Sequence, residues 1–367
     1  MRRLLALLVL LAGCRRAPAR ADVLLWHTFD PDEAAVLERA LAGGSPRVAL
    51  RAVPFSRGQN VLRAALERGG DECPDVARVD AAWIPAFARR ELIVEAPAGF
   101  LPGAVEPAAA ALAEYGGKRY GAAQTFGCLA LLSRTAGAGP RTLDELAARM
   151  QAGGPRDVRA DGFWFLPWLF AQGGDAFEPA SGRIGVAGAP AQAALTRLAE
   201  LARGPREDDP IAALAAGRLA LAIDGPWVLG RLAGTEVHVA PFPAGPDGPA
   251  APVVGQIWVV GRCSKDPARA FRLIETLVSP RVAGMMARQA FAPPALVEAR
   301  AAAPPVVQEF MAACPPRGLP RHEMSALLFD DLTPAVAAVL GGEATPAEAL
   351  ADVERAWRRR LAALERP

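Results

Sequence analysis

The chain between residues 23 and 89 alternates between short apolar runs and helix-like segments, and this alternation constrains the fold more than any other feature. The segments expected in turn as strand and helix are Val23 to Trp26, Ala34 to Ala42, Val48 to Val53, Val61 to Leu66, Val76 to Val79 and Ala81 to Arg89. Strands that alternate with helices are typical of a parallel sheet covered by helices. We therefore predict an α/β fold whose ligands meet the loops after the strands.

The N-terminal segment has the layout of an export signal. Two arginines precede an apolar run from Leu4 to Leu11, and Leu11-Ala12-Gly13-Cys14 follows it. The run is too short to span a membrane, and a cysteine at the cleavage site is typical of a lipobox. We predict that residues 1–21 form a lipoprotein signal peptide and tether in which Cys14 is lipidated. An ordinary cleaved signal with an incidental cysteine is the alternative.

Length and charge limit the domains and partners. The chain has 367 residues, and the roughly 345 that remain after processing are enough for two domains. The 41 basic and 39 acidic residues are scattered along the chain, so we expect no nucleic-acid partner. No later apolar stretch approaches the roughly eighteen residues of a transmembrane helix, so the lipid is the only expected membrane attachment.

Four further cysteines would lie in an oxidising compartment, and none of them forms a CxxC spacing. They are Cys73, Cys128, Cys263 and Cys314. One or two disulfides are expected, but the sequence leaves three pairings open. Free buried cysteines are the alternative.

The sequence lacks the common signatures of enzymes and metal sites. The three histidines, His27, His238 and His322, show no zinc-ligand spacing, and there is no G-x-S-x-G, Walker A or G-x-G-x-x-G motif. We therefore expect no metal, no cofactor and no enzymatic activity. Carboxylates such as Asp80, Asp161 and Asp330 leave a glycosidase pair as a minor alternative.

The second half of the chain contains motifs that place a lobe crossing and several helices. The apolar run from Ala122 to Leu132, interrupted by Gln124 and Thr125, is expected to cross between lobes. Thr142 with Glu145 predicts a capping box. The aromatic segment Phe163 to Phe170 is expected mainly in the core. Amphipathic helices are predicted over three later ranges, Pro267 to Val278, Arg281 to Gln289 and Pro346 to Leu364.

Ten short sequence pieces between Trp26 and Leu361 form a recognisable series. They are Pro74-Asp75-Val76 with Trp83 and Phe87, Gly117-Lys118-Arg119-Tyr120-Gly121, Pro140-Arg141-Thr142-Leu143-Asp144-Glu145-Leu146, Ala171-Gln172-Gly173-Gly174, Ala222-Ile223-Asp224-Gly225-Pro226-Trp227, Pro241-Phe242-Pro243, Val254-Gly255-Gln256, Ser264-Lys265-Asp266-Pro267, Met324-Ser325-Ala326 and Thr345-Pro346-Ala347-Glu348-Ala349-Leu350. In their residues and their order, these pieces resemble the extracellular solute-binding lipoproteins of ABC importers, in the branch similar to maltose-binding protein. The resemblance covers Trp26 to Leu361.

The resemblance implies a two-lobed periplasmic-binding-protein type II fold with a ligand cleft between the lobes. Each lobe would be discontinuous in the chain. Lobe 1 would hold residues 22–124 and about 260–305, and lobe 2 would hold about 125–259 and about 306–367.

The same resemblance implies a set of ligand-binding residues. Trp227 resembles the family's stacking tryptophan, and its Gly-Pro turn would present it to the ligand. The other expected ligand contacts are Thr28, Asp30, Asp80, Trp83, Gln124, Asp161, Trp164, Gln256, Trp258 and Phe329. The segment Leu327-Leu328-Phe329-Asp330-Asp331 departs from the maltose binders, so maltose itself is not implied.

The expected function is capture of a small solute, first of all a mono- or oligosaccharide, for the membrane subunits of an importer. The protein would be a monomer, lipid-anchored at the cell envelope, in the periplasm or on the outer face of the membrane. The alternatives are a ligand-sensing subunit, a degenerate envelope binding protein and an exported glycosidase.

Overall fold

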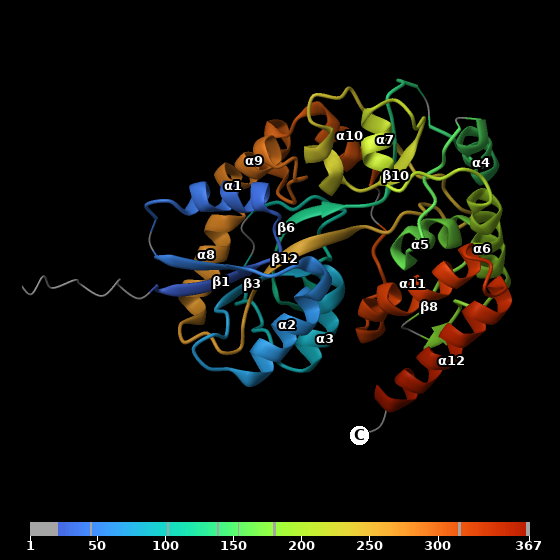
Figure 1. Ribbon diagram of the computed structural model, residues 1–367. Coiled ribbons are helices and arrows are strands. Elements are labelled where there is room, and N and C mark those ends of the chain that lie inside the picture. The colour runs from blue at the N-terminus through green and yellow to red at the C-terminus, as the bar shows by residue number, and fades with distance from the viewer. Residues whose placement is uncertain are drawn as a thin grey trace, which may run out of the picture.

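The computed structural model describes residues 21–364 except 45, 101–102, 138, 153, 179–180 and 315–316, and excludes the side chains of 328 and 329. The expected signal peptide and Cys14 lie outside the described residues. Figure 1 shows two lobes side by side, the first around β1, β3 and β12 and the second around α5, α6 and α11. The fold is therefore α/β and two-lobed, as predicted.

The first lobe is built on a five-stranded sheet in the order β2-β1-β3-β12-β6. The strands are β1 (Val23–His27), β2 (Val48–Ala52), β3 (Val76–Asp80), β6 (Gly121–Gly127) and β12 (Val254–Val260). The first three strands are parallel, as the alternating sequence predicts. Strand β12 runs antiparallel to both β3 and β6, so the complete sheet is mixed.

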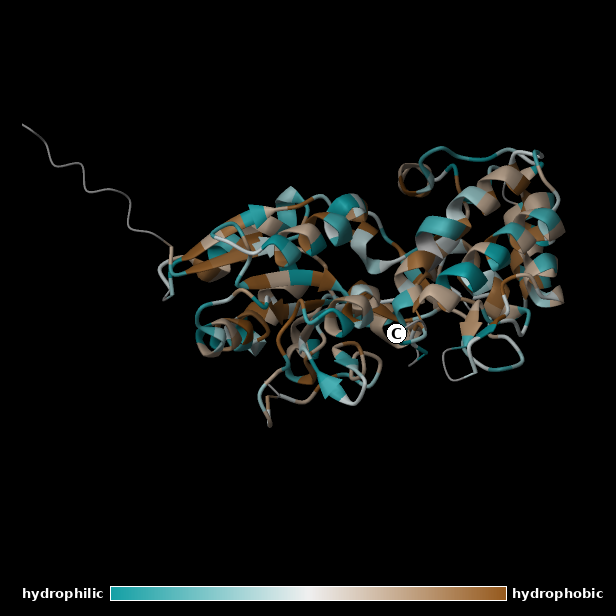
Figure 2. Ribbon diagram, turned by 90° about the horizontal axis from the view of Figure 1, so that it is seen from below, coloured by the Kyte–Doolittle hydropathy of each residue, from teal (hydrophilic) through white to brown (hydrophobic). Residues whose placement is uncertain are grey.

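Helices cover both faces of this sheet. One face packs against α1 (Pro31–Leu41), α8 (Pro267–Leu277) and α9 (Pro280–Gln289), and the other packs against α2 (Phe55–Arg68) and α3 (Ile84–Arg89). In Figure 2 the strands of this lobe are mostly hydrophobic, whereas its helices mix hydrophobic and hydrophilic residues. This pattern is the one expected for a sheet buried on both faces.

Asp30 begins α1 with a capping box. Its carboxylate accepts a hydrogen bond from the Glu33 backbone N–H, and the Glu33 carboxylate accepts one from the Asp30 N–H. Thr142 caps α4 (Leu143–Ala152) in a related way, accepting from the Glu145 N–H at 3.1 Å. The Glu145 carboxylate, however, accepts from the N–H of Arg141, one residue before the expected donor.

The second lobe contains a small antiparallel sheet in the order β10-β7-β11, surrounded by helices. Its strands are β7 (Ala130–Ser133), β10 (Ala222–Asp224) and β11 (His238–Pro241). The helices, besides α4, are α5 (Gly162–Ala171), α6 (Ala189–Ala202), α7 (Pro210–Ala215), α10 (Pro305–Ala313), α11 (Leu327–Leu340) and α12 (Pro346–Leu364). Helix α11 packs against α5, α6 and α12 and contributes Leu332 and Val336 to the core.

Short elements complete the fold. The 3-10 helices are η1 (Ala81–Trp83), η2 (Pro226–Leu232), η3 (Val297–Ala302) and η4 (Glu323–Ala326). In one short hairpin β4 (Glu114–Tyr115) pairs with β5 (Lys118–Arg119), and in another β8 (Phe177–Glu178) pairs with β9 (Arg183–Ile184). Among the described residues, no helix has the length and apolarity needed to cross a membrane.

The chain passes between the two sheets where the sequence predicted a crossing. The run from Ala122 to Leu132 divides into β6 in the first sheet and β7 in the second. The chain returns between β11 and β12, and it passes again to the second lobe between η3 and α10. Residues 254–259, expected in lobe 2, lie in the first sheet because β12 pairs with β3 and β6.

The structure pairs all four described cysteines. Cys73 bonds to Cys263 with the Cα atoms 6.3 Å apart, and Cys128 bonds to Cys314 with the Cα atoms 5.5 Å apart. The two bonded pairs are 190 and 186 residues apart in the chain. The expectation of one or two disulfides is therefore met by two, and one of the three open pairings is selected.

Candidate functional site

Polar and aromatic side chains gather at one edge of the first sheet. The parallel strands β1, β2 and β3 end at this edge, and Thr28, Phe55 and Asp80 lie at or just after their ends. Strand β6 also ends here and β12 begins here, since Gly127 pairs with Val254. Because β6 leaves toward the second lobe and β12 arrives from it, this edge faces the second lobe.

Arg78 is the centre of the polar groups at this edge. Its Nε donates to Oε1 of Gln124 at 2.7 Å, and its Nη1 donates to Oγ1 of Thr28 at 3.0 Å. The guanidinium lies 4.0 Å from the ring centroid of Phe29, and the residue is only 5% exposed. Burial lowers the pKa of Arg78 to about 10, so the side chain remains charged at neutral pH. Arg78 was not among the predicted site residues, although both of its partners, Thr28 and Gln124, were.

Asp80 and Gln256 form a second polar pair. The Asp80 carboxylate accepts from the Ala82 N–H at 2.8 Å and from Nε2 of Gln256 at 2.9 Å. Burial raises the pKa of Asp80 to about 6 in spite of these bonds. Oε1 of Gln256 is buried and has no hydrogen-bond partner among the described residues. The two residues were predicted separately, and the pairing of β3 with β12 brings them together.

An exposed aromatic ring lies beside these polar groups. Trp83 is 5% exposed and stacks on Phe55, which is 52% exposed, with ring centroids 5.5 Å apart. Gly58 makes room for this arrangement, because a Cβ atom there would lie 2.8 Å from Trp83 Cη2. Trp83 therefore supports Phe55 from behind and presents little surface itself. Phe55 was not among the predicted site residues, although its position after the second parallel strand indicates this edge of the sheet.

The edge of the second sheet that faces the first lobe carries Trp227. Strand β10 ends at Asp224 opposite Ala130, where β7 begins directly after the crossing. The turn Gly225-Pro226 follows and presents Trp227, which is 47% exposed. The Trp227 ring lies back over Gly225, where a Cβ atom would overlap it. Trp227 is thus the main exposed aromatic residue at this edge.

Two aromatic residues at the start of α5 support Trp227. The ring centroids of Phe163 and Trp164 lie 6.1 and 6.3 Å from that of Trp227. Asp161 begins the helix and accepts from the Phe163 N–H at 2.7 Å. Burial raises the pKa of Asp161. The structure therefore groups three of the predicted residues, Trp227, Trp164 and Asp161.

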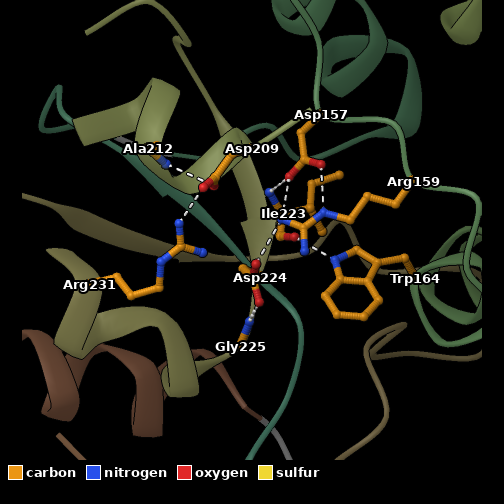
Figure 3. Close-up of polar contacts among 9 residues, drawn as sticks. All are labelled: Asp157, Arg159, Trp164, Asp209, Ala212, Ile223, Asp224, Gly225 and Arg231. Carbon is orange, nitrogen blue, oxygen red and sulfur yellow. Dashed lines mark hydrogen bonds and ion pairs between the residues drawn. The ribbon is translucent and has the colours of Figure 1, made fainter. Parts of the chain in front are cut away.

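A network of charged groups holds Trp164 in place (Figure 3). Arg159 donates to Asp157 through Nε at 2.8 Å and pairs with Asp224 through Nη2 at 2.7 Å. Asp157 accepts from the Ile223 N–H at 2.8 Å, and Nε1 of Trp164 donates to the Ile223 carbonyl at 2.7 Å. The Arg159 guanidinium also lies 4.6 Å from the Trp164 ring centroid. The network links β10, and hence the Trp227 turn, to the start of α5.

Two predicted site residues are not placed at these edges. The side chain of Trp258 points from β12 into the layer between the sheet and its helices, where it packs against Phe29. Trp258 is only 1% exposed and therefore has no surface for a ligand. The side chain of Phe329, at the start of α11, lies outside the described part of the chain. The remaining predicted first-lobe residue, Asp30, lies exposed at this edge as the N-cap of α1.

The fold and the two facing edges define a two-lobed binding protein. Residues 45–284 match the family of bacterial extracellular solute-binding proteins. The chain therefore belongs to this family, whose members are exported proteins that bind solutes. A comparison of the sequence with curated proteins gave no match.

Solved structures with the same fold cover nearly the whole chain. The GacH receptor of Streptomyces glaucescens GLA.O, solved unliganded and with acarbose, has a TM-score of 0.81 at 24% identity, over 92% of this chain and 97% of its own. The maltose/maltodextrin-binding domain MalE from Bdellovibrio bacteriovorus, bound to maltotriose, has a TM-score of 0.78 at 17% identity. The match covers 93% of this chain and 99% of MalE. An ABC transporter solute-binding protein from Thermotoga lettingae TMO, bound with α-D-tagatose, has a TM-score of 0.77 at 21% identity. The match covers 92% of this chain and 98% of that protein.

Proposed function

We propose that this protein is the substrate-binding component of an ABC importer, that its ligand is a saccharide, and that it is not an enzyme. The observation that carries the proposal is the presence of one exposed aromatic residue on each facing edge, Phe55 and Trp227, with fixed polar groups beside both.

The chemistry of a sugar matches this arrangement. A sugar ring has apolar C–H faces, which stack on aromatic side chains, and hydroxyl groups around its edge, which need planar donors and acceptors. On the first lobe, Thr28, Arg78, Gln124, Asp80 and Gln256 supply such groups next to Phe55.

Capture follows from the division of the site between two lobes. Contacts from both edges to one ligand form only when the lobes approach each other, so the ligand shifts the molecule toward a closed state by its higher affinity for that state. The membrane subunits of the importer would recognise the closed state. A lipid on Cys14 would keep the monomeric protein at the membrane surface near the importer.

The condition of the carboxylates favours binding over glycoside hydrolysis. A glycosidase needs one carboxyl group to donate a proton to the ligand and a second one near it. Both oxygens of Asp80 already accept hydrogen bonds from the protein, and Asp224 is ion-paired with Arg159. The saccharides bound to the GacH receptor, to MalE and to the Thermotoga lettingae protein also support a saccharide ligand.

A ligand screen tests the proposal. Thermal unfolding of the chain from Arg15 onward is measured with mono-, di- and trisaccharides, polyols and amino acids. A ligand at one hundred times its Kd stabilises the folded state by about 2.7 kcal/mol, a shift that is easily measured. We expect stabilisation by at least one saccharide and a loss of about tenfold in affinity, about 1.4 kcal/mol, in Trp227→Ala.

Matched variants separate stacking from general damage. Trp227→Phe keeps a ring and is expected to retain most of the affinity, and Val61→Ala changes another exposed apolar residue, which lies in α2 of the first lobe. Stabilisation by amino acids but by no saccharide would contradict the proposed ligand class. A saccharide that binds Trp227→Ala as well as the unmodified protein would contradict the proposed site.

A further inference from the structure

The two disulfides occupy different places relative to the boundary between the lobes. Cys73 precedes β3 and Cys263 follows β12, and these strands are neighbours in the first sheet, so their bond lies within the first lobe. Cys128 lies between β6 and β7, where the chain passes from one sheet to the other, and Cys314 ends α10. The second bond therefore starts at a passage between the lobes.

Cys128 lies where the chain leaves the first sheet. Gly127, directly before it, pairs with Val254 of β12, and Ala130, two residues after it, pairs with Asp224 of the second sheet. Because so few residues separate the two pairings, a rotation of one lobe against the other must change the backbone close to Cys128.

Cys314 lies just before a segment that contacts a second passage. The Arg317 carbonyl accepts a hydrogen bond from the N–H of Val253, and Gly318 forms a parallel bridge with the same residue. Val253 directly precedes β12, so it belongs to the passage that returns from β11 to the first sheet. The chain after Cys314 is therefore bound to this passage.

The same segment, residues 317–326, continues on the surface of the first lobe. Arg321 donates to the carbonyl of Leu112 at 3.0 Å, and the buried Glu323 pairs with Arg89 of α3 at 2.9 Å. The chain then enters the second lobe as α11. The segment is thus held by the first lobe, with second-lobe helices before and after it.

The bond between Cys128 and Cys314 joins these parts of the chain covalently, and we call it the hinge disulfide. Hydrogen bonds alone connect the other contacts between the passages. With the bond in place, the passage at Cys128 cannot bend independently of the segment after α10. The bond therefore limits the relative positions that the two lobes can take.

We propose that the hinge disulfide restricts the lobes to a narrow path of closure and thereby raises the affinity for the ligand. A constraint on the ligand-free protein removes arrangements in which the two edges do not face each other, so less freedom is lost on binding. Cys128 and Cys314 are then positioning residues, since both side chains are buried. The effect on affinity rests on the proposed function, whereas the restriction of lobe motion does not.

The first-lobe disulfide provides a matched control. One double variant is Cys128→Ala, Cys314→Ala, and the other is Cys73→Ala, Cys263→Ala. The bonded cysteines are 186 and 190 residues apart, so both variants release the unfolded chain to nearly the same extent. A difference between the variants in lobe motion or affinity therefore comes from the place of the bond.

Lobe motion is measured in the ligand-free protein by double electron–electron resonance. Nitroxide labels are attached through p-acetylphenylalanine at Val61 in α2 and at Glu200 in α6, which are exposed on different lobes. We expect the distance distribution of the Cys128→Ala, Cys314→Ala variant to be about twofold wider than that of the unmodified protein. The control variant should keep the unmodified width. Equal widths in all three proteins would overturn the proposal.

Affinity is measured by isothermal titration calorimetry with glucose, maltose, maltotriose and each saccharide that stabilises the protein in the thermal screen. We expect the Kd to rise about three- to tenfold in Cys128→Ala, Cys314→Ala and to stay unchanged in the control variant. An unchanged Kd in both variants, or an equal rise in both, would overturn the proposal and leave the proposed function standing. If no saccharide binds the unmodified protein, the proposed function fails, and the distance distribution alone decides whether the bond restricts the lobes.

A reversible measurement separates the loss of the bond from damage to the fold. In the chain from Arg15 onward, the control variant keeps only the two cysteines of the hinge disulfide. Dithiothreitol reduces this bond to two thiols with two electrons and two protons, and is itself oxidised to a cyclic disulfide. We expect the Kd to rise on reduction and to return on reoxidation, with an unchanged far-ultraviolet circular dichroism spectrum. A Kd that is the same with both thiols titrated as free would overturn the proposal.

Discussion

At the scale of single residues, the buried Arg78 and the half-buried Arg159 hold corresponding places on the two lobes. Arg78 joins Thr28 and Gln124 and lies over a phenylalanine ring, and Arg159 joins Asp157 and Asp224 and lies over a tryptophan ring. Both guanidinium groups fix polar partners beside an aromatic residue before any ligand arrives. Preorganisation of this kind reduces the ordering cost of binding.

Gly225 determines the position of the Trp227 ring. A Cβ atom at this residue would overlap the ring, so Gly225→Ala must displace Trp227 from its place beside Trp164. We expect the affinity for the saccharide identified in the screen to fall about tenfold or more, with a change in tryptophan fluorescence of the free protein. The control is Gly230→Ala in η2, the 3-10 helix that contains Trp227, because no atom lies within 4 Å of a Cβ there. Equal affinity of the two variants would show that the ring position does not matter.

Asp80 makes the stability of the protein depend on pH. Burial raises its pKa in the folded state to about 6, above the ordinary value of 3.8. The folded protein therefore holds more protons than the unfolded chain between these pH values, so the contribution of Asp80 to stability falls as the pH rises through this window. Two pKa units correspond to about 3 kcal/mol as an upper value.

Asp80→Asn tests this dependence. Asparagine keeps the acceptor for the Ala82 N–H, and its amide can donate to the unpartnered Oε1 of Gln256 after a turn of the Gln256 amide. The free energy of unfolding of each protein is measured with urea at pH 4 and at pH 7. We expect the difference, variant minus unmodified protein, to be larger at pH 7 than at pH 4 by up to about 3 kcal/mol. A difference that stays constant would place the pKa of Asp80 near its ordinary value.

At the scale of elements, helix α5 divides its aromatic residues between two tasks. Phe165, Trp168 and Phe170 are buried in the core of the second lobe, whereas Phe163 and Trp164, in the first turn, lie half-buried beside Trp227. This segment was predicted to lie mainly in the core, which is correct for its later turns. The first turn belongs to the site because Asp161 begins the helix at the edge facing the first lobe.

The disulfide between Cys128 and Cys314 anchors the crossing strand to α10. Cys128 directly follows β6, and Cys314 ends α10 in the second lobe. A bond that closes a loop of 186 residues restricts the unfolded chain strongly. In the double variant Cys128→Ala, Cys314→Ala we expect the free energy of unfolding to fall by about 2–5 kcal/mol, as urea unfolding measures. The unmodified protein with both disulfides reduced should lose at least as much, and a loss below about 1 kcal/mol in the variant would contradict the expected restriction.

At the scale of the whole molecule, the chain passes between the lobes several times through short segments. The passages between β6 and β7, between β11 and β12, and between η3 and α10 lie far apart in the sequence. Several parallel connections allow rotation of one lobe against the other and oppose their separation. This is the architecture in which a hinge closes two domains around a ligand.

Closure of the lobes is a measurable consequence of the proposed function. We expect the radius of gyration from small-angle X-ray scattering to decrease when the saccharide found in the screen is added to saturation. Trp227→Ala at the same saccharide concentration, which is near its own Kd after a tenfold loss of affinity, should show a smaller decrease in radius than the unmodified protein. An unchanged radius with the site fully occupied would show that binding does not require closure.

The sequence by itself determined the local structure of this protein. The alternating runs, the capping residue Thr142 and the Gly-Pro turn before Trp227 all depend on neighbours within a few residues, so their patterns can be interpreted without the fold. The two-lobed α/β architecture followed from these patterns together with the family resemblance.

Only the tertiary structure decided which distant residues meet and which side chains remain exposed. The insertion of β12 between β3 and β6 brings Gln256 to Asp80 and buries Trp258, and long-range packing leaves Phe55 and Trp227 exposed while their aromatic neighbours are covered. The pairing of the four cysteines was settled in the same way. Strand order and burial depend on contacts between residues far apart in the chain, and local periodicity carries no information about those contacts.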